Sequence, residues 1–335
     1  MALRPLIPLL ALAAALGAGR AGETVRPALC AGGPGLPAIV AAEGLRPVAD
    51  DGPVIDERTP AGIACDARTG AILAWYAERR GSRAVLFRRG ADGAFERREL
   101  LATRGRIRAG LVEGDAAALA VEHRRSWELL LVGPGHGRRG RSIEVPGPVA
   151  GLVLAGGGAT LLVGCDDQVR SFSWPDGRTG EVFLVGGPLR ALAPEPGSGH
   201  LLAVADEGGV ALFDLSGRRV RGALAEVARR PLLGVEALAW AGPGQGWLVA
   251  LRPAAREIVV LEPAGMREVR RVALEAPPVA AAVTEDGETA LVADETGAVI
   301  ALETGPPPRA PLATVPERTA VAGPVPARAP DQAPP

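Results

Sequence analysis

"SGHLLAVADEGGVALFDLSG" occupies residues 198–217, and "DGETALVADETGAVIALETG" occupies residues 286–305. Both stretches read as a turn, an apolar run, an acidic turn, a second apolar run and a closing turn. Apolar runs of about five residues, bounded by Gly, Asp or Pro, are typical of β-strands joined by tight turns. A pattern that returns within one chain indicates a repeat architecture.

A glycine that stands before an apolar run marks each copy of this pattern. Seven such glycines lie 35 to 47 residues apart: Gly35, Gly70, Gly114, Gly158, Gly199, Gly246 and Gly287. Units of three or four short strands that repeat about every 40–45 residues are typical of the blades of a β-propeller. No stretch has the sustained periodicity of an amphipathic helix, so helices are expected to be scarce.

We therefore predict an all-β fold, a seven-bladed β-propeller of four-stranded antiparallel blades over residues 22–315, with six blades as the alternative. A single blade is apolar on both faces and cannot bury them alone. Packing the blades radially covers these faces, and closing the ring leaves only short strand edges. The alternative folds are a parallel β-helix and a pair of β-sandwiches, and neither accounts for the length of the repeat.

The order of an apolar strand, an Asp-Gly turn, "TALVAD", a further turn and "AVIALETG" resembles WD-repeat and YVTN-type β-propellers. "LFDLSG" at residues 212–217 stands where those repeats carry Trp-Asp or Ile-Asp. The chain departs from both patterns, because Gly199-His200 falls on a different turn from the Gly-His pair of WD repeats and no Tyr-Val-Thr-Asn box is present. The resemblance implies the fold. Exported propellers of the YVTN type include large subunits of quinone-dependent amine dehydrogenases, and the analogy does not transfer that function.

Residues 1–21 are predicted to be a Sec-type signal peptide. Arg4 supplies a positive charge, residues 6–16 form an apolar run, and small residues allow cleavage after Ala18 or Ala21. The apolar run is shorter than the roughly 20 residues that a membrane-spanning helix needs. The chain is therefore expected to be periplasmic or secreted and not to span a membrane. Residues 316–335 are rich in proline and are predicted to form a disordered tail.

The charge balance argues against nucleic acid as a partner. The 335-residue chain has 37 basic residues, all of them Arg, and 38 acidic residues, which gives a net charge of -1. A nucleic-acid-binding domain should carry net positive charge or a clustered basic face. Abundant Arg, Gly, Pro and Ala together with the absence of Lys and Asn indicate the codon bias of a GC-rich genome.

One register of the repeat predicts a binding surface. Counting back from each marker glycine reaches the start of the innermost strand, near one mouth of the channel. The charged residues at this register are Arg26, Arg108, Arg190 and Glu236. The remaining blades place Gly62, Ala150 and Ala280 there. Three arginines on alternate blades predict a basic mouth that attracts an acidic loop or a small anion. Ordinary solvated charge at the rim is the alternative.

Cys30 and Cys65 each lie five residues before a marker glycine, which makes a disulfide between them possible. Equivalent positions point the same way around a ring, so the expected geometry is unfavourable and the question stays open. The third cysteine, Cys165, adds no metal-ligand spacing.

The remaining polar residues are interpreted as structural. His123, His136 and His200 fall in different registers and are expected in turns or on the surface. The acidic pairs 166–167, 206–207 and 294–295 are expected in the turns between second and third strands, because Asp favours turns. The five tryptophans are expected to pack between blades: Trp75, Trp127, Trp174, Trp240 and Trp247. No catalytic residue, metal or cofactor is predicted.

The sequence thus predicts an exported, non-catalytic module that binds another protein through one propeller face, or a scaffold. Two other classes stay open. One is an accessory propeller subunit of a periplasmic quinone- or haem-dependent dehydrogenase. The other is a metal-dependent propeller hydrolase or lactonase.

Overall fold

The computed structural model describes residues 28–30, 39–42, 44–47, 54–66, 68–136, 140–196, 199–216, 224–241, 246–283 and 289–303. The predicted signal peptide at residues 1–21 and the predicted tail at residues 316–335 lie outside these residues. One short 3₁₀-helix, η1 (Pro253–Ala255), is the only helical element of the described chain. No helix in that part of the chain has the length and apolar character needed to cross a bilayer.

Within the described residues, the strands follow one another in chain order and form seven antiparallel sheets, here numbered blades 1 to 7. The first three blades are β1 (Ala28–Cys30), β2 (Ile39–Ala42) and β3 (Gly44–Pro47); β4 (Gly62–Cys65), β5 (Ile72–Glu78), β6 (Gly81–Arg89) and β7 (Phe95–Thr103); and β8 (Arg106–Glu113), β9 (Ala116–Glu122), β10 (Trp127–Val132) and β11 (Arg141–Val145).

The other four blades continue the same order. They are β12 (Val149–Ala155), β13 (Thr160–Cys165), β14 (Gln168–Ser173) and β15 (Thr179–Leu184); β16 (Ala191–Pro194), β17 (Leu201–Asp206), β18 (Gly209–Asp214) and β19 (Ala225–Arg230); β20 (Ala237–Ala241), β21 (Trp247–Arg252), β22 (Glu257–Glu262) and β23 (Arg267–Ala273); and β24 (Pro278–Val283), β25 (Thr289–Asp294) and β26 (Val299–Glu303).

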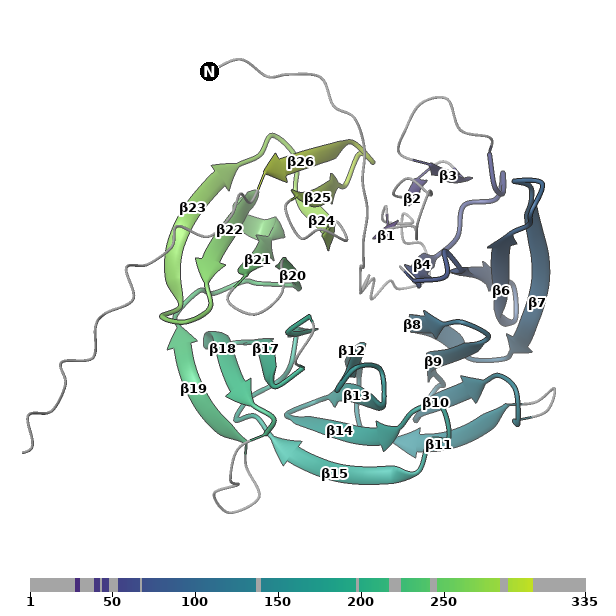
Figure 1. Cartoon of the computed structure of the whole chain (residues 1–335), viewed down its shortest axis with the longest axis horizontal. Helices are drawn as coiled ribbons and strands as arrows, with labels where there is room; N and C mark the ends of the chain where they lie inside the picture. The colour runs from purple at the N-terminus through teal and green to yellow at the C-terminus, as the bar shows by residue number, and fades with distance from the viewer. Residues whose placement is uncertain are drawn as a thin grey trace, which may run out of the picture.

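The sheets stand around a central axis, with the first strand of each blade innermost (Figure 1). Each innermost strand contacts that of the next blade, and β24 of blade 7 contacts β1 of blade 1, which closes the ring. The prediction of an all-β propeller built from antiparallel blades is confirmed. Seven sheets correspond to the seven marker glycines, each of which falls between the first and second strands of its blade.

Blades 1 and 7 have three strands each in the described chain, where four were predicted. In blade 1 an isolated bridge between Leu45 and Asp56 stands at the fourth position. The Leu45 amide donates a hydrogen bond to the Asp56 carbonyl at 2.7 Å, and the Ile55 amide donates to the Leu45 carbonyl at 2.9 Å. The fourth position of blade 1 therefore contributes only a short stretch of β-pairing to its outer edge.

The hydrophobic core lies between blades, because the two faces of each strand serve different neighbours. In β5, Ile72 and Ala74 pack in a cluster with blades 1 and 7, whereas Leu73 and Trp75 pack in a cluster with blade 3. The same alternation gives buried clusters between blades 3 and 4, 4 and 5, 5 and 6, and 6 and 7. This explains why the strands read as continuous apolar runs: both faces are covered.

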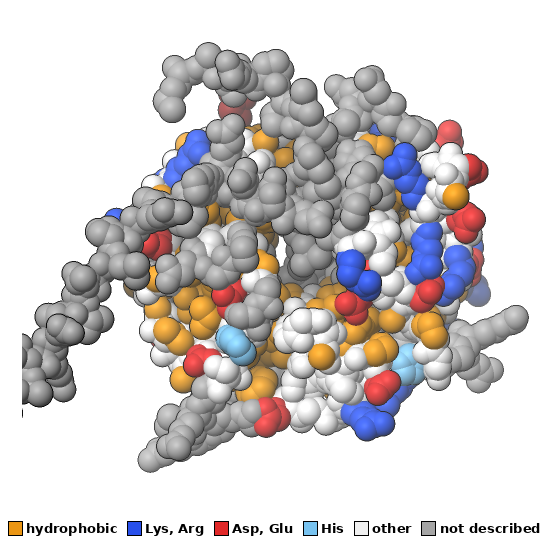
Figure 2. Space-filling view, viewed as in Figure 1, with side chains coloured by type: hydrophobic (Ala, Val, Ile, Leu, Met, Phe, Trp, Pro, Cys, Tyr) orange, Lys and Arg blue, Asp and Glu red, His pale blue; other side chains and the backbone are white. Residues whose placement is uncertain are grey.

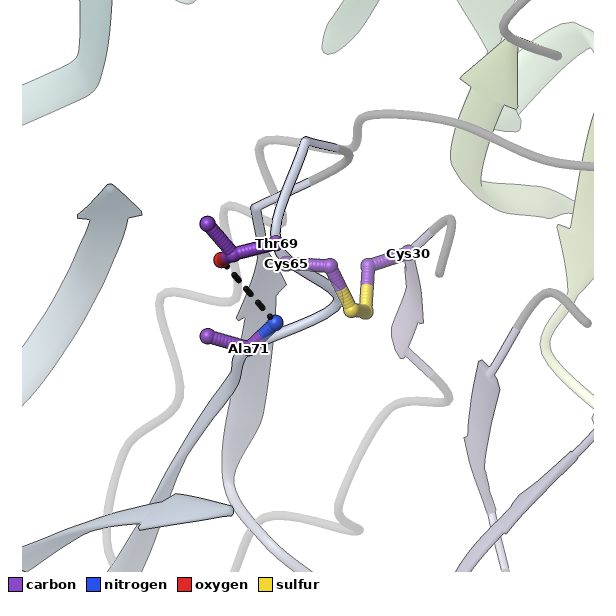
Figure 3. Close-up of a disulfide and its surroundings, with 4 residues drawn as sticks. All are labelled: Cys30, Cys65, Thr69 and Ala71. Carbon is purple, nitrogen blue, oxygen red and sulfur yellow. Dashed lines mark hydrogen bonds between the residues drawn. A yellow bond between two sulfur atoms is a disulfide. The ribbon is translucent and has the colours of Figure 1, made fainter. Parts of the chain in front are cut away.

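A disulfide joins the innermost strands of blades 1 and 2. Cys30 ends β1 and Cys65 ends β4, and their Cα atoms lie 5.7 Å apart (Figure 3). This separation is ordinary for a disulfide. The pairing that the sequence left open is possible in this fold, because innermost strands converge at the axis and bring equivalent positions of neighbouring blades together.

Candidate functional site

The predicted channel mouth is built on the start of the innermost strands. Arg108 lies in β8, while Arg190 and Glu236 directly precede β16 and β20. Arg108 is the extra residue of a β-bulge between the Ile107 and Ala109 pairs. Arg26 lies outside the described residues. The structure thus brings three of the four predicted residues to equivalent places in three blades.

Carboxylates of the same blades neutralise two of these arginines. Arg108 forms an ion pair of 2.6 Å with Glu122, the last residue of β9. Arg190 forms one of 3.1 Å with Glu207, in the turn after β17. Arg108 and Arg190 therefore each have an internal counter-charge that an incoming anion would have to compete with. The binding role of the mouth stays a prediction.

The acidic pairs lie in the turns between second and third strands, as predicted. Asp206 accepts hydrogen bonds from the Gly208 amide at 2.7 Å and from the guanidinium of Arg229, and Asp294 accepts from the amides of Thr296 and Ala298. These contacts stabilise the turns themselves. In the described part of the chain, no group of three or more His, Cys, Asp or Glu residues is arranged to hold a metal ion.

The tryptophans pack between blades, as predicted for them. Trp75, Trp240 and Trp247 are buried in clusters that each span two neighbouring blades. Trp174 of blade 4 donates a hydrogen bond through its indole nitrogen to Glu113 of blade 3, at 2.7 Å. Of the histidines, His123 is paired with Glu128 in its own hairpin at 2.8 Å.

A groove at the outer wall is the site that sequence reasoning missed. It has a volume of about 680 Å³ and lies between β7 of blade 2 and the end of β10 in blade 3. We call it the β7 groove, and its lining residues are Arg98, Glu99, Leu100, Leu101, Ala102, Val132, Gly133, Pro134 and Gly135. Because its two walls belong to different blades, no single repeat unit contains it.

A repeated dipeptide could have pointed to the outer strands that form such walls. Each of the five outer strands β7, β11, β15, β19 and β23 contains Glu followed by Leu or Val. In β7, β19 and β23 the apolar member is the extra residue of a β-bulge: Leu100, Val227 and Val269. Val227 and Val269 are exposed, whereas Leu100 is partly buried against the cluster of blades 2 and 3.

Charge is distributed unevenly around the ring. Residues 61–145, which form blades 2 and 3, contain 16 Arg and 10 Asp or Glu, while residues 146–303, which form blades 4 to 7, contain 13 Arg and 20 Asp or Glu. Figure 2 shows arginines gathered on the right of the view, over blades 2 and 3. The near-zero net charge of the chain conceals a basic sector, which contains the β7 groove, and an acidic sector.

Comparisons with known proteins support the fold and assign no family. No family model matches the sequence, and no curated protein matches it. A chain in the crystal structure of the mitotic checkpoint complex superposes with a TM-score of 0.65 at 12% identity, over 91% of this chain and 96% of that one. In total, 1076 chains of solved structures match, so the fold is too widespread to specify a function. This likeness supports the fold alone.

Proposed function

We propose that this chain is an exported β-propeller that binds another protein through its outer wall and has no catalytic centre of its own. The observation that carries the proposal is the β7 groove, where leucines, an arginine and a strand edge line one opening. Concave surfaces with apolar walls and a few polar groups are the usual binding sites of proteins. Loops and edges held by several blades also give a rigid platform for a partner.

Two observations support export. Residues 1–21 have the charge and apolar run of a signal peptide. The disulfide between Cys30 and Cys65 would persist in an oxidising compartment and would be rare in the cytosol. We therefore place the working protein in the periplasm or outside the cell.

Export is tested by producing the full chain in a bacterial host and fractionating the cells. The expected result is a protein outside the cytoplasm whose mass corresponds to cleavage after Ala18 or Ala21. The control replaces Leu9 and Leu10 by Arg, which interrupts the apolar run and should retain the chain in the cytoplasm. An unprocessed wild-type chain in the cytoplasm would contradict the proposal.

Binding is tested by capturing partners from the native extracellular or periplasmic fraction and identifying them by mass spectrometry. The expected result is one protein in stoichiometric amount whose interaction is reproduced with both purified components. A partner that brings a quinone or haem group would favour the dehydrogenase-subunit alternative. A stoichiometric metal in the purified chain would favour a hydrolase. Without a partner that reconstitutes, the proposed function is wrong.

A further inference from the structure

β7 is an exposed edge strand with room beside it. It is the last strand of blade 2 and pairs along one edge with β6, so its other edge has no strand partner in the described chain. It has 9 residues, more than any other outer strand in that part of the chain. Unpaired amide and carbonyl groups on a long edge strand are a template for an added strand.

The wall opposite β7 is held in place by contacts to blade 4. Residues 132–135 end β10 and enter the hairpin that leads to β11. His136 approaches the Pro175 carbonyl at 3.0 Å, and Arg141 donates a hydrogen bond to the Asp176 carbonyl at 2.8 Å. These contacts fix both ends of the hairpin, so the β7 groove is bounded on each side by an anchored structure.

The apolar part of the groove belongs to the bulge of β7. Leu100 is the extra residue between the Ala84–Leu101 and Val85–Glu99 pairs. A bulge re-aims side chains next to it, and both Leu100 and Leu101 line the groove while packing partly against the interblade cluster. An incoming aliphatic side chain would therefore contact apolar atoms that are already positioned.

The sector that surrounds the groove carries net positive charge, whereas the ion pairs at the groove itself are mixed. Arg88 and Arg98 share one carboxylate, that of Asp115 in blade 3, at 2.9 Å and 3.5 Å. On the other side, Glu99 of the lining shares Arg83 with Glu78, at 3.1 Å and 2.6 Å, so these ion pairs balance one another. The positive charge comes from the surrounding sector, because residues 61–145 contain 16 Arg and 10 Asp or Glu. A field of this sign attracts acidic segments and steers their approach.

We propose that the β7 groove binds an extended segment of a partner protein in which acidic and aliphatic residues alternate, and that this segment adds to β7 as a fifth strand of blade 2. The inference rests on the proposed function and names the partner chemistry for its groove. Backbone hydrogen bonds to β7 supply affinity, Leu100 and Leu101 accept aliphatic side chains, and Arg98 selects acidic ones. The two leucines in the lining offer a nucleic-acid strand neither charge nor a hydrogen bond, whereas they fit the aliphatic residues of a peptide.

The test uses a capped peptide of alternating Glu and Val, equal in length to the 9 residues of β7, labelled for fluorescence anisotropy with the full chain. Binding is expected, and it should weaken as salt rises. A peptide of alternating Lys and Val should not bind, because its charge is reversed. A peptide of alternating Glu and Pro should not bind either, because proline has no amide hydrogen to donate.

Two matched variants test the place of binding. Arg98→Glu should lower the affinity for the Glu-Val peptide about tenfold or more. Arg267→Glu is the control, because Arg267 is also an exposed outer-strand arginine with one carboxylate partner, Glu262, but lies in blade 6. It should change the affinity less than about twofold, and thermal unfolding should show that both variants fold.

The outcomes separate this inference from the proposed function. The peptide should displace the captured partner. The inference is wrong if a partner binds but the peptide neither binds nor displaces it. It is also wrong if Arg98→Glu and Arg267→Glu change the affinity equally. Either result would leave the proposed protein-binding function unaffected. Displacement of the peptide by a single-stranded DNA oligonucleotide would overturn the assigned partner chemistry. If no partner reconstitutes, the proposed function fails, and the peptide measurement still decides whether the groove binds such a segment.

Discussion

Asp56 connects the outer edge of blade 1 to blade 2. Its carboxylate accepts hydrogen bonds from the Tyr76 hydroxyl at 2.9 Å and from the Arg58 guanidinium at 3.1 Å, and that guanidinium lies 4.3 Å from the centre of the Tyr76 ring. Burial alone would raise the pKa of Asp56, but the hydrogen bonds from Arg58 and Tyr76 lower it on balance. Three side chains thus stabilise an edge that has little strand pairing.

The lowered pKa of Asp56 predicts a loss of stability in acid. The folded-state pKa lies below the ordinary value of 3.8, so the ionised carboxylate stabilises the fold fully at pH values above 3.8. This stabilisation is lost as the pH falls through the folded-state pKa. Asp56→Asn should lower the free energy of unfolding by about 1–2 kcal/mol near neutral pH. Urea unfolding at about pH 7 and about pH 3 should show that the difference in free energy of unfolding between the wild type and Asp56→Asn is smaller in acid. An equal difference at both pH values would contradict the prediction.

Cys165 should be unreactive in the folded protein. It is fully buried in blade 4, and burial raises the pKa of its thiol to about 12, which leaves almost no thiolate at neutral pH. Maleimide should label no thiol in the native chain, one after denaturation without reductant, and all 3 after reduction. Labelling of more than one thiol in denaturant alone would contradict the Cys30–Cys65 disulfide.

At the scale of elements, glycines in two innermost strands make room for a tryptophan side chain between blades. Trp75 of β5 lies against Gly62 of β4 and Gly110 of β8, so that one indole fills the space between blades 2 and 3. A Cβ atom added at Gly110 would lie 2.7 Å from Cζ3 of Trp75, and one added at Gly62 would also collide with the ring. The two glycines are needed here for space.

Gly110→Ala should therefore lower the free energy of unfolding by about 1–3 kcal/mol through overpacking. Gly265→Ala is the control, because a Cβ at Gly265 meets no atom within 4 Å, and its effect should stay within about 0.5 kcal/mol. Combining Gly110→Ala with Trp75→Phe should cost less than the sum of the two changes. Strict additivity in a denaturation cycle would show that Trp75 and Gly110 do not compete for space.

At the scale of the molecule, the ring closes through blade 1. One buried cluster joins blades 7, 1 and 2, and the Cys30–Cys65 disulfide joins the innermost strands of blades 1 and 2 within it. Blade 1 has three short strands and one isolated bridge, which is less pairing than in the four-stranded blades. A covalent link at this point compensates for a blade with few hydrogen bonds.

Removing that link should destabilise the whole propeller. A disulfide between positions 35 residues apart is worth about 3–4 kcal/mol in the chain-entropy model. Replacing both Cys30 and Cys65 by Ser should lower the unfolding temperature, and a reductant should lower that of the wild type while leaving the double variant unchanged. The same unfolding temperature with and without the disulfide, measured calorimetrically, would show that ring closure does not depend on it.

The blade pattern was predictable from the sequence because it depends on local chemistry. Gly70, Gly114 and Gly158 each have a positive φ, which glycine adopts without strain, and they separate the first two strands of their blades. Alternating contacts to two neighbours require apolar residues throughout a strand, and the sequence contains such runs. The number of units, the turn positions of Asp206 and Asp294, and the interblade place of Trp75 all follow from residues close together in the chain.

The sites depend on residues that only the closed ring brings together. The approach of Cys30 to Cys65 follows from the convergence of innermost strands, which a linear register does not contain. The neutralisation of Arg108 by Glu122 depends on how a bulge turns one side chain. The β7 groove needs walls from two blades, and their separation is set by packing between sheets. The sequence by itself therefore determined the repeat, whereas radial packing decided where charges, thiols and open surfaces meet.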